Sequence, residues 1–214
     1  MITIQKFVFN PFSENTYVVF NDEKKAVIID PGMYHEEEEK ALDNFIISSG
    51  LKVEAIWHTH SHLDHMFGTG YACSKYDLLP MIFEKDLDTY QSFERVCAMY
   101  GVPIRHSPPD KVQFMDLKKD LTLGTTKFNV LFVPGHAPGH VVFYHAQSKI
   151  LINGDCLFRE SIGRTDLPGG NHNQLINSIK SKLFSLPDDT KVYSGHGPET
   201  TIGHEKAYNP FVNY

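Results

Sequence analysis

The stretch Trp57 to Gly70, WHTHSHLDHMFGTG, places four histidines and one aspartate within eight positions. Imidazole nitrogens and carboxylate oxygens are the ligands that many divalent metal ions prefer. A solvated loop carries one or two histidines by chance, but this set follows the apolar run KVEAIW, which is typical of a buried strand. The sequence therefore predicts a metal-binding turn at the end of that strand. Its candidates are His58, His60, His62, Asp64 and His65.

Alternation along the strand and the turn that follows it should divide these side chains between two places. Because alternate residues of a strand point to one face, His60 and His62 are expected to converge on one point. Asp64 and His65, after the turn, are expected to reach a second point. The pattern thus favours two neighbouring metal sites.

Three further ligand-type residues follow predicted strands and sit beside glycine. They are His136 in VPGHAPGH, Asp155 in INGDCLF and His196 in YSGHGPET. Glycine allows the tight turn and the close backbone approach that a strand needs if the next side chain is to point into a shared site. A single histidine of this kind is usually structural, but the recurrence of this context favours a common metal centre.

Sorting these ligand-type residues into sets gives a hypothesis with two metal ions. One ion would be held by His60, His62 and His136, the other by Asp64, His65 and His196, with Asp155 as a bridging ligand. A nitrogen-rich set without thiolate suits zinc, with iron or manganese as alternatives. Two such ions can share a hydroxide of lowered pKa, which is a nucleophile at neutral pH. Hydrolysis is the expected chemistry.

The elements that must position these residues can be read from apolar periodicity and turn residues. Strands are expected at 2–9, 15–20, 25–30, 79–83 (the LPMIF run), 127–133, 140–145, 149–153 and 190–194, in addition to the KVEAIW strand. Helices are expected at 35–49, 84–99 and 172–184. The first three strands fit an antiparallel meander. We expect one domain, residues 1–214, with two sheets covered by helices.

Composition restricts the functional classes. The 214 residues are 41% hydrophobic and 21% charged, with a net charge of −6 and scattered Lys and Arg, so no nucleic-acid partner is expected. No signal peptide or membrane-spanning run is evident, and the three cysteines are widely spaced. A cytoplasmic protein without a membrane partner, whose cysteines are buried free thiols, is predicted.

In combination and order, THSHLDH, PGHAPGH, GD and GHG resemble the metallo-β-lactamase superfamily. With NTYVV and IIDPG near the start, and GRTDLPGG and GPETTIGHEKAYNPF near the end, the resemblance covers nearly the whole chain and is strongest to the short glyoxalase II-type hydrolases. It implies an α+β fold, a four-layer αββα sandwich with a dinuclear site at one edge. It also implies that Thr59 belongs to the supporting strand, and we assign His58 no metal role.

Residues outside the ligand set have two interpretations each. Asp30 in DPG either orients a ligand histidine through its free ring nitrogen or only forms a turn. His140 is expected to be a turn residue or a support for a ligand. Arg164 in GRTD either reaches a substrate anion or pairs with Asp166 to fix its loop, and the pairing is preferred.

The resemblance implies hydrolysis of a thioester of the S-lactoylglutathione type. A metal-bridging hydroxide would attack the acyl carbon, and Asp64 would both ligate and orient it. Longer glyoxalase II enzymes carry a helical C-terminal extension for glutathione, whereas this sequence stops at NPFVNY. The tripeptide is then held differently, or another small thioester is the substrate.

Two alternatives from other classes are considered. A persulfide dioxygenase-like oxidoreductase would use mononuclear iron on His60, His136 and Asp155, but the SGHGPET context of His196 favours two metals. A non-catalytic metal-binding module would be expected to have lost ligands, and none is missing. True β-lactamase activity is disfavoured because Asp155 stands where those enzymes tend to use cysteine.

Overall fold

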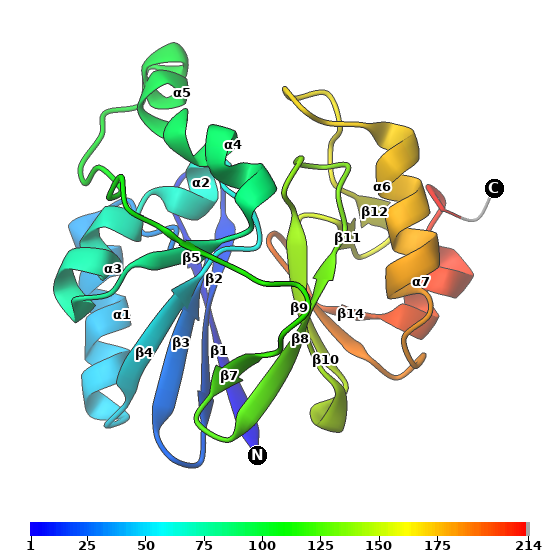
Figure 1. Cartoon of the computed structure of the whole chain (residues 1–214), viewed down its shortest axis with the longest axis horizontal. Coiled ribbons are helices and arrows are strands. Elements are labelled where there is room, and N and C mark those ends of the chain that lie inside the picture. Colours follow the sequence, from blue (N-terminus) through cyan, green and yellow to red (C-terminus); the bar gives the residue numbers. More distant parts are fainter. Residues whose placement is uncertain (213–214) are drawn as a thin grey trace. The chain divides into compact units, whose positions relative to one another are not determined.

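A computed structural model describes residues 1–212 and divides into two compact units. The first comprises Met1–Met115 and Thr122–Thr126, and the second comprises Asp116–Leu121 and the chain from Lys127 onward. Each unit is built on a mixed β-sheet with adjacent helices (Figure 1). The expectation of one domain over residues 1–214 stays a prediction.

The first unit contains a sheet in the order β1-β2-β3-β4-β5-β6. Its elements are β1 (Ile2–Phe9), β2 (Glu14–Asn21), β3 (Lys25–Ile29), α1 (Glu36–Ser48), β4 (Lys52–Trp57), α2 (Leu63–Met66), α3 (Thr69–Tyr76), β5 (Pro80–Ile82), η1 (Glu84–Asp86), α4 (Leu87–Gln91), α5 (Phe93–Tyr100) and β6 (Gln113–Phe114). Strands β1, β2 and β3 form the predicted antiparallel meander. Strands β4, β5 and β6 then add in parallel, which brings their carboxyl ends to one edge of the sheet.

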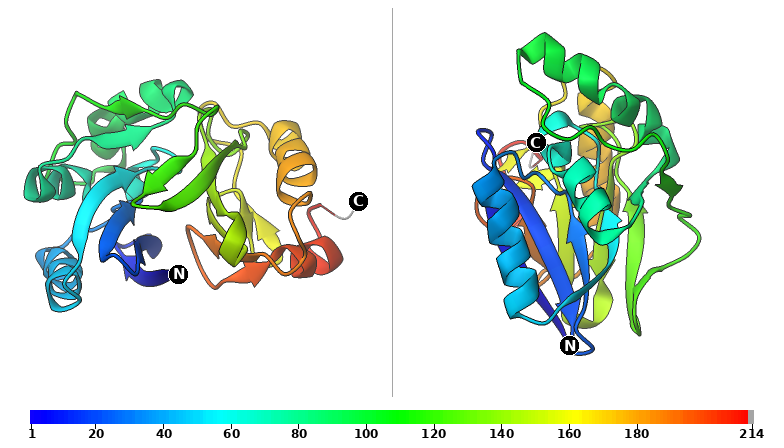
Figure 2. Two further views of the ribbon diagram at one scale, coloured as in Figure 1. Left: turned by 60° about the horizontal axis from the view of Figure 1, so that its bottom comes forward. Right: turned by 90° about the vertical axis from the view of Figure 1, so that its left-hand side faces the viewer.

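Helix α1 runs along this sheet, as the two views in Figure 2 show. Its apolar residues Leu42 and Ile46 are buried against Val18 and Ile28 of the strands, in one hydrophobic core. Four glutamates occupy its first turn, where carboxylates favour the positive end of the helix dipole. Glu36 and Glu37 are exposed, whereas Glu38 is half-buried and Glu39 is buried.

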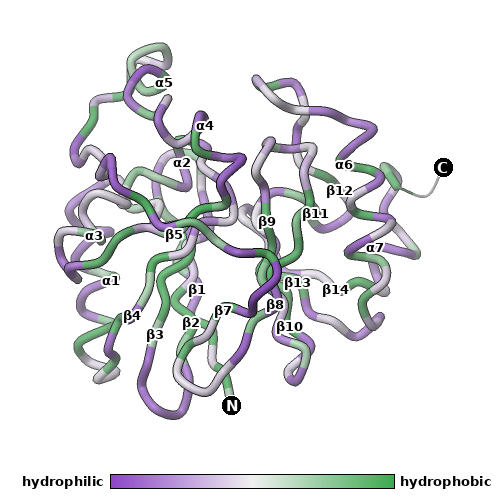
Figure 3. Tube along the Cα trace, viewed as in Figure 1, coloured by the Kyte–Doolittle hydropathy of each residue, from purple (hydrophilic) through white to green (hydrophobic). Residues whose placement is uncertain are grey.

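The second unit contains most of a sheet in the order β14-β13-β10-β9-β8-β7 and a separate β11-β12 hairpin. Apart from β7 (Leu121–Leu123), most of which belongs to the first unit, the elements are β8 (Thr126–Phe132), β9 (Val141–His145), η2 (Ala146–Ser148), β10 (Ile150–Gly154), β11 (Leu157–Phe158), β12 (Ser161–Ile162), α6 (His172–Ser178), η3 (Ile179–Leu183), β13 (Lys191–Ser194), β14 (Thr200–Thr201) and α7 (Ile202–Tyr208). Its core joins Leu175 and Ile179 to Val142, Leu151 and Val192 of the strands. Hydrophobic residues gather in the strands, whereas the turns between them are hydrophilic (Figure 3).

Two sequence predictions need correction. In place of the helix expected at 84–99, the chain forms three shorter helices, η1, α4 and α5. Ser92 separates α4 from α5. The Ser92 hydroxyl donates to the Thr89 carbonyl at 2.8 Å, a local bond that competes with continuous helix. The KVEAIW strand is buried only at Ile56 and Trp57, since its earlier residues are half-buried or exposed.

Helices α2, α3 and α7 were not predicted, because each is eight residues or shorter and lacks a full apolar period. The prediction for the cysteines is confirmed: Cys73, Cys97 and Cys156 are free and buried. Within residues 1–212, no helix has both the length and the apolar character needed to cross a bilayer.

Candidate metal centre

The histidine-rich turn begins where β4 ends. The chain has no regular structure from His58 to His62 and bends at Thr59, and α2 then starts at Leu63. The ring centroid of His60 lies 4.7 Å from that of His62 and 4.2 Å from that of His65. The first unit therefore gathers the three histidines closely, although they come from both sides of the turn.

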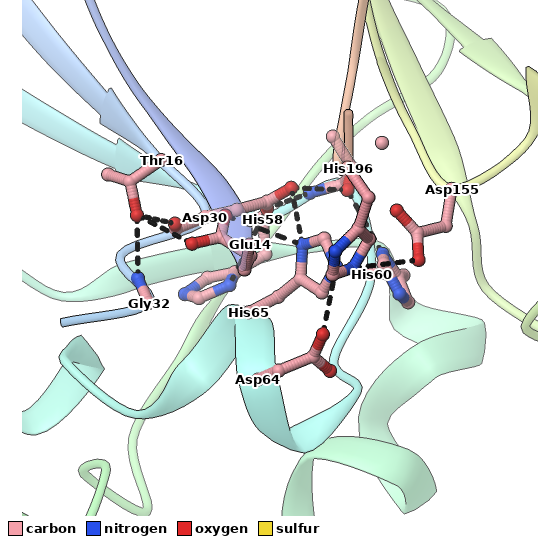
Figure 4. A network of polar contacts seen from close by, with 12 residues as sticks. Glu14, Thr16, Asp30, Gly32, His58, His60, Asp64, His65, Asp155 and His196 are labelled. Atoms are coloured by element: carbon pink, nitrogen blue, oxygen red, sulfur yellow. Dashed lines mark hydrogen bonds and ion pairs between the residues drawn. The ribbon is translucent and has the colours of Figure 1, made fainter. Parts of the chain in front are cut away.

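Asp30 lies behind this turn and organises it (Figure 4). It follows β3 with φ of 51°, a left-handed conformation that is uncommon outside glycine. Its Oδ1 accepts the Thr59 backbone N–H at 2.7 Å, and its Oδ2 accepts the Thr59 hydroxyl at 2.6 Å. The same Oδ2 lies 3.1 Å from His65 Nδ1. Asp30 thus holds the strand end and one histidine ring together.

These bonds fix which nitrogen of each ring is protonated. Asp30 Oδ2 is an acceptor, so His65 carries its proton on Nδ1. Thr59 uses its only proton toward Asp30, so its oxygen accepts the Nδ1–H of His60 at 3.1 Å. In both rings the lone pair is then on Nε2, the atom that a metal ion would use.

A second buried carboxylate, Glu14, stands at the start of β2. Its Oε2 accepts the Thr16 hydroxyl at 2.8 Å, and its Oε1 lies 3.8 Å from His65 Nδ1. Burial raises the pKa of Glu14 well above its usual range, and the His65 ring acts in the opposite direction. A Cβ on Gly32 would lie 2.0 Å from Glu14 Oε2, so this carboxylate requires glycine there.

Asn10 ties the loop between β1 and β2 to the same place. Its side-chain amide donates to the Gly32 and Asp64 carbonyls, both at 2.9 Å. Its backbone N–H donates to the Glu38 carboxylate at 2.8 Å. Asn10 thereby holds the backbone of Asp64, although its side chain carries no ligand chemistry.

His58 is buried beside Asp30, with its Nδ1 3.9 Å from Asp30 Oδ1. Burial lowers its pKa from 6.5 to about 4, so the ring is neutral at pH 7. Its Nε2 lies 3.3 Å from the Thr69 hydroxyl, at the start of α3. This contact links the strand end to the helix.

The second unit brings together His136, Asp155 and His196 from three separate strand ends. His136 follows β8, Asp155 follows β10 directly, and His196 follows β13. Gly154 precedes the aspartate with φ of 51°, so the predicted need for glycine is met there. Asp155 Oδ2 lies 3.6 Å from His136 Nε2 and 3.5 Å from His196 Nε2. Two ring nitrogens therefore converge on one carboxylate oxygen.

The GRTD loop holds the other side of His136. His136 Nδ1 lies 2.8 Å from the Arg164 carbonyl, which can only accept, so Nε2 again carries the lone pair. The Arg164 guanidinium binds Asp166 in a bidentate pair, with both N···O distances at 2.7 Å. This pair lowers the pKa of Asp166 to about 2. The predicted pairing of Arg164 is present, and its backbone contacts the candidate ligand.

His140 lies inside the second unit, fully buried, beside Asp155 and Cys156. Its Nε2 accepts the Asp155 backbone N–H at 3.1 Å. The sequence left open whether His140 is a turn residue or a support. The structure places it against the backbone of a candidate ligand.

The separations within each unit fit a divalent ion. In addition to the two distances at Asp155, His65 Nε2 lies 3.7 Å from Asp64 Oδ2. All three exceed the length of a good hydrogen bond. Ligand atoms about 2.1 Å from a tetrahedral ion lie about 3.4 Å apart, close to these values. The donor chemistry and spacing of the residues thus suit zinc or a similar ion.

Sequence reasoning missed Glu14, Asn10 and the contact between His140 and Cys156. Glu14 and Asn10 belong to NPFSENTYVV, where polar residues stand beside a strand that is otherwise apolar. Such residues are usually attributed to the turn. The signal that the sequence did offer was Glu14, a carboxylate at the start of an otherwise apolar strand. In the structure the Glu14 side chain is fully buried.

Comparison with known proteins places these features in a family. The family model described as "Metallo-beta-lactamase superfamily" matches residues 9–196. The hydroxyacylglutathione hydrolase GloC of Haemophilus influenzae is 38% identical over 205 residues, which cover 94% of this chain and 94% of that protein. The superfamily binds divalent metal ions.

Solved structures agree. BLEG-1, described as a B3 metallo-β-lactamase, has a TM-score of 0.89 and 36% identity, covering 99% of this chain and all of that one. The protein TTHA1623, solved in a di-iron-bound form, has a TM-score of 0.86 and 38% identity, covering 97% and 99% of the two chains. ETHE1 from Myxococcus xanthus has a TM-score of 0.78, with 24% identity over 99% of this chain and 85% of that one. The predicted α+β metallo-β-lactamase fold class is confirmed. The chain therefore belongs to the metallo-β-lactamase superfamily of metal-dependent hydrolases.

Proposed function

We propose that this enzyme hydrolyses a thioester of the hydroxyacylglutathione type at a centre of two divalent ions. The ligands of one ion would be His60, His62 and His136, and those of the other Asp64, His65 and His196, with Asp155 shared. The observation that carries the metal assignment is the anchoring of Nδ1 in His60, His65 and His136. It leaves each Nε2 to face a metal ion.

When bound, the two ions supply a water of lowered pKa as the nucleophile at neutral pH. The chain's own residues then act by orientation. Asp64 would ligate one ion and orient that water, and the Asn10 amide donates to the Asp64 carbonyl from behind. Asp30 holds the Nδ1 proton of His65, so Nε2 is the atom of this ring that would face a metal ion. Because the water is the nucleophile, no serine or cysteine nucleophile is needed. The thiol of Cys156 is fully buried.

Zinc is the first choice of ion, and iron and manganese are the alternatives. The di-iron form of TTHA1623 supports iron as a real competitor. Metal analysis of the purified protein after growth in separately supplemented media decides among them. A reducing compartment, the cytoplasm, remains our prediction for where the protein works, on the basis of its buried free thiols.

The thioester assignment is supported by the 38% identity with the GloC hydrolase. The test is loss of thioester absorbance when zinc-loaded protein is mixed with S-lactoylglutathione, with a chelator-treated sample as control. Turnover that the chelator abolishes is the expected result. If two metals are bound but the thioester persists, this substrate is rejected.

A second candidate is β-lactam hydrolysis, favoured by the 36% identity and full coverage of BLEG-1. A chromogenic cephalosporin assayed beside the thioester separates the two, and we expect the thioester to be the better substrate. The dioxygenase-like alternative has weaker support, because the likeness to ETHE1 at 24% identity speaks for the fold alone. Oxygen uptake with glutathione persulfide on iron-loaded protein tests it.

A further inference from the structure

We propose that His140 and Cys156 are positioning residues that fix the backbone of Asp155 for metal binding. The inference rests on the proposed function in one respect, the role of Asp155 as a metal ligand. Neither residue touches the reacting atoms. They act through a chain of hydrogen bonds that can be traced atom by atom.

The direction of each bond follows from the first one. The Asp155 backbone N–H can only donate, so His140 Nε2, 3.1 Å away, must be the unprotonated acceptor. The ring is neutral and carries its proton on Nδ1, which lies 3.3 Å from Cys156 Sγ. The thiol in turn donates to the Val133 carbonyl at 3.4 Å. Every donor in this series of three hydrogen bonds therefore faces an acceptor.

This tautomer is the same as that of the candidate ligands, but the Nε2 lone pair is used differently. His60, His65 and His136 keep the Nε2 lone pair for a metal ion, whereas His140 uses its Nε2 lone pair on the protein's own backbone. His140 is thus committed to support, and its position four residues after His136 does not make it a fourth ligand of the same type.

Burial makes these bonds hard to replace. His140, Cys156 and Val133 have no exposed surface. Water cannot substitute for a lost partner at such a site, so removing one group leaves the Asp155 N–H or the His140 ring unsatisfied. The apolar surroundings also explain why this thiol is a structural donor rather than a reactive group: burial raises the pKa of Cys156 well above its usual value.

The chain of bonds connects two metal-ligand positions. It begins at Asp155 and ends at Val133, three residues before His136, and the Val133 N–H also donates to the His140 carbonyl at 3.0 Å. The direction of the Asp155 carboxylate depends on its backbone, which follows the left-handed Gly154. The pair thereby sets the 3.6 Å separation between Asp155 Oδ2 and His136 Nε2.

Two substitutions of His140 distinguish the contact made by its Nε2 from the contact made by its Nδ1. His140→Gln can place its amide oxygen near the site of Nε2 and accept the Asp155 N–H, whereas His140→Asn reaches only the site of Nδ1. We expect zinc affinity, measured by competition with a chromophoric chelator, to fall about 10- to 100-fold in His140→Asn. We expect it to stay near the wild-type value in His140→Gln.

Thermal unfolding of the metal-free proteins distinguishes positioning from simple packing. The two variants should unfold at similar temperatures, because each keeps one of the two contacts of the ring and loses the other. Equal zinc affinity in both would overturn the proposal. Cys156→Ser and Cys156→Ala form a second pair, because serine keeps a group that accepts and donates and alanine keeps neither. The serine variant should retain the higher zinc affinity.

A spectroscopic measurement tests the hydrogen bonds without any metal. In metal-free protein labelled with ¹⁵N-histidine, His140 should give the signature of a neutral ring protonated on Nδ1, and this signal should vanish in His140→Gln. A ring protonated on Nε2 would overturn the proposal even if zinc binds normally. Failure of wild-type protein to bind zinc, with the Nδ1–H signal present, would instead count against the proposed function.

Discussion

The two units supply ligand-type side chains in different ways. In the first, His60, His62, Asp64 and His65 lie within six consecutive positions on one turn. In the second, His136, Asp155 and His196 are spread over sixty-one positions and meet because three strand ends do. A local turn can be recognised from spacing alone, whereas the second group exists only through the order of strands in a sheet.

The support behind the ligands differs as well. The first unit uses an acidic side chain: Asp30 stands behind His65, and the buried Glu14, whose pKa is raised by burial, lies 3.8 Å from the same ring nitrogen. The second uses neutral groups, the Arg164 carbonyl behind His136 and the His140 ring behind the Asp155 amide. Anionic support strengthens the basicity of a ligand ring, whereas neutral support mainly fixes direction. Substitution can remove the Asp30 carboxylate and the His140 ring, whereas the Arg164 carbonyl belongs to the backbone and is kept.

Removal of a ligand from either unit should have the largest effect. His60→Ala and Asp155→Ala should each lower kcat/KM for the thioester by more than the about 100-fold typical of a lost supporting residue. Circular dichroism should show that the fold persists. His172→Ala, at an exposed histidine, is the control and should behave as wild type. Activity that survives either ligand substitution would remove that unit from the metal centre.

Loss of the anionic support should rank second. Asp30→Ala leaves the Thr59 N–H, the Thr59 hydroxyl and His65 Nδ1 without their acceptor. The free energy of unfolding should fall by about 3 kcal/mol or more, because each buried unsatisfied group costs about 1–3 kcal/mol. Zinc affinity should fall about 10- to 100-fold. Urea unfolding and chelator competition measure the two effects, and an unchanged zinc affinity would reduce Asp30 to a turn residue.

Two glycines, one in each unit, lie so close to neighbouring atoms that an added Cβ would collide with them. A Cβ on Gly32 would lie 2.0 Å from Glu14 Oε2, and one on Gly163 would lie 1.9 Å from the Asp155 carbonyl oxygen. Gly32→Ala and Gly163→Ala should each destabilise the protein by about 1–3 kcal/mol through overpacking. Gly203→Ala, where the nearest atoms are at 3.0 Å on Asp188, should cost less. Equal unfolding midpoints for all three would contradict the crowding.

The smallest effect is expected for the exposed Arg164–Asp166 pair. The lowered pKa of Asp166, about 2 in the folded protein, means that its ionised form is favoured by folding. Its contribution to stability is therefore present near neutral pH and fades only as the pH falls from about 4 toward 2. Arg164→Ala should remove this acid dependence and leave the neutral-pH melting temperature almost unchanged.

Kinetics add a second measurement on the same residue. If the Arg164 side chain only fixes its loop, KM for the thioester should change little in Arg164→Ala, because the backbone carbonyl that holds His136 is kept. A large rise in KM with unchanged kcat would show instead that the guanidinium binds a substrate anion.

Much of the fold was readable from the sequence because apolar periodicity is a local signal. The meander β1–β3, helix α1 and the strands before His136, Asp155 and His196 were all predicted close to their observed bounds. The break at Ser92 was not, since it depends on one hydroxyl that bonds back to Thr89. Short elements such as α2 and α7 depend on tertiary contacts and carry little periodic pattern.

The ligand-type residues themselves were determined by the sequence, through residue type, spacing and the recurring strand-then-glycine context. Only the tertiary structure decided what stands behind them. Glu14 is sixteen residues from Asp30 and fifty-one from His65, yet all three meet in the first unit. The sequence left His140 as a turn residue or a support and predicted Cys156 to be a buried free thiol, whereas their contact is seen only in the folded chain. Hydrogen-bond direction and burial are properties of the packed interior, and no local pattern encodes them.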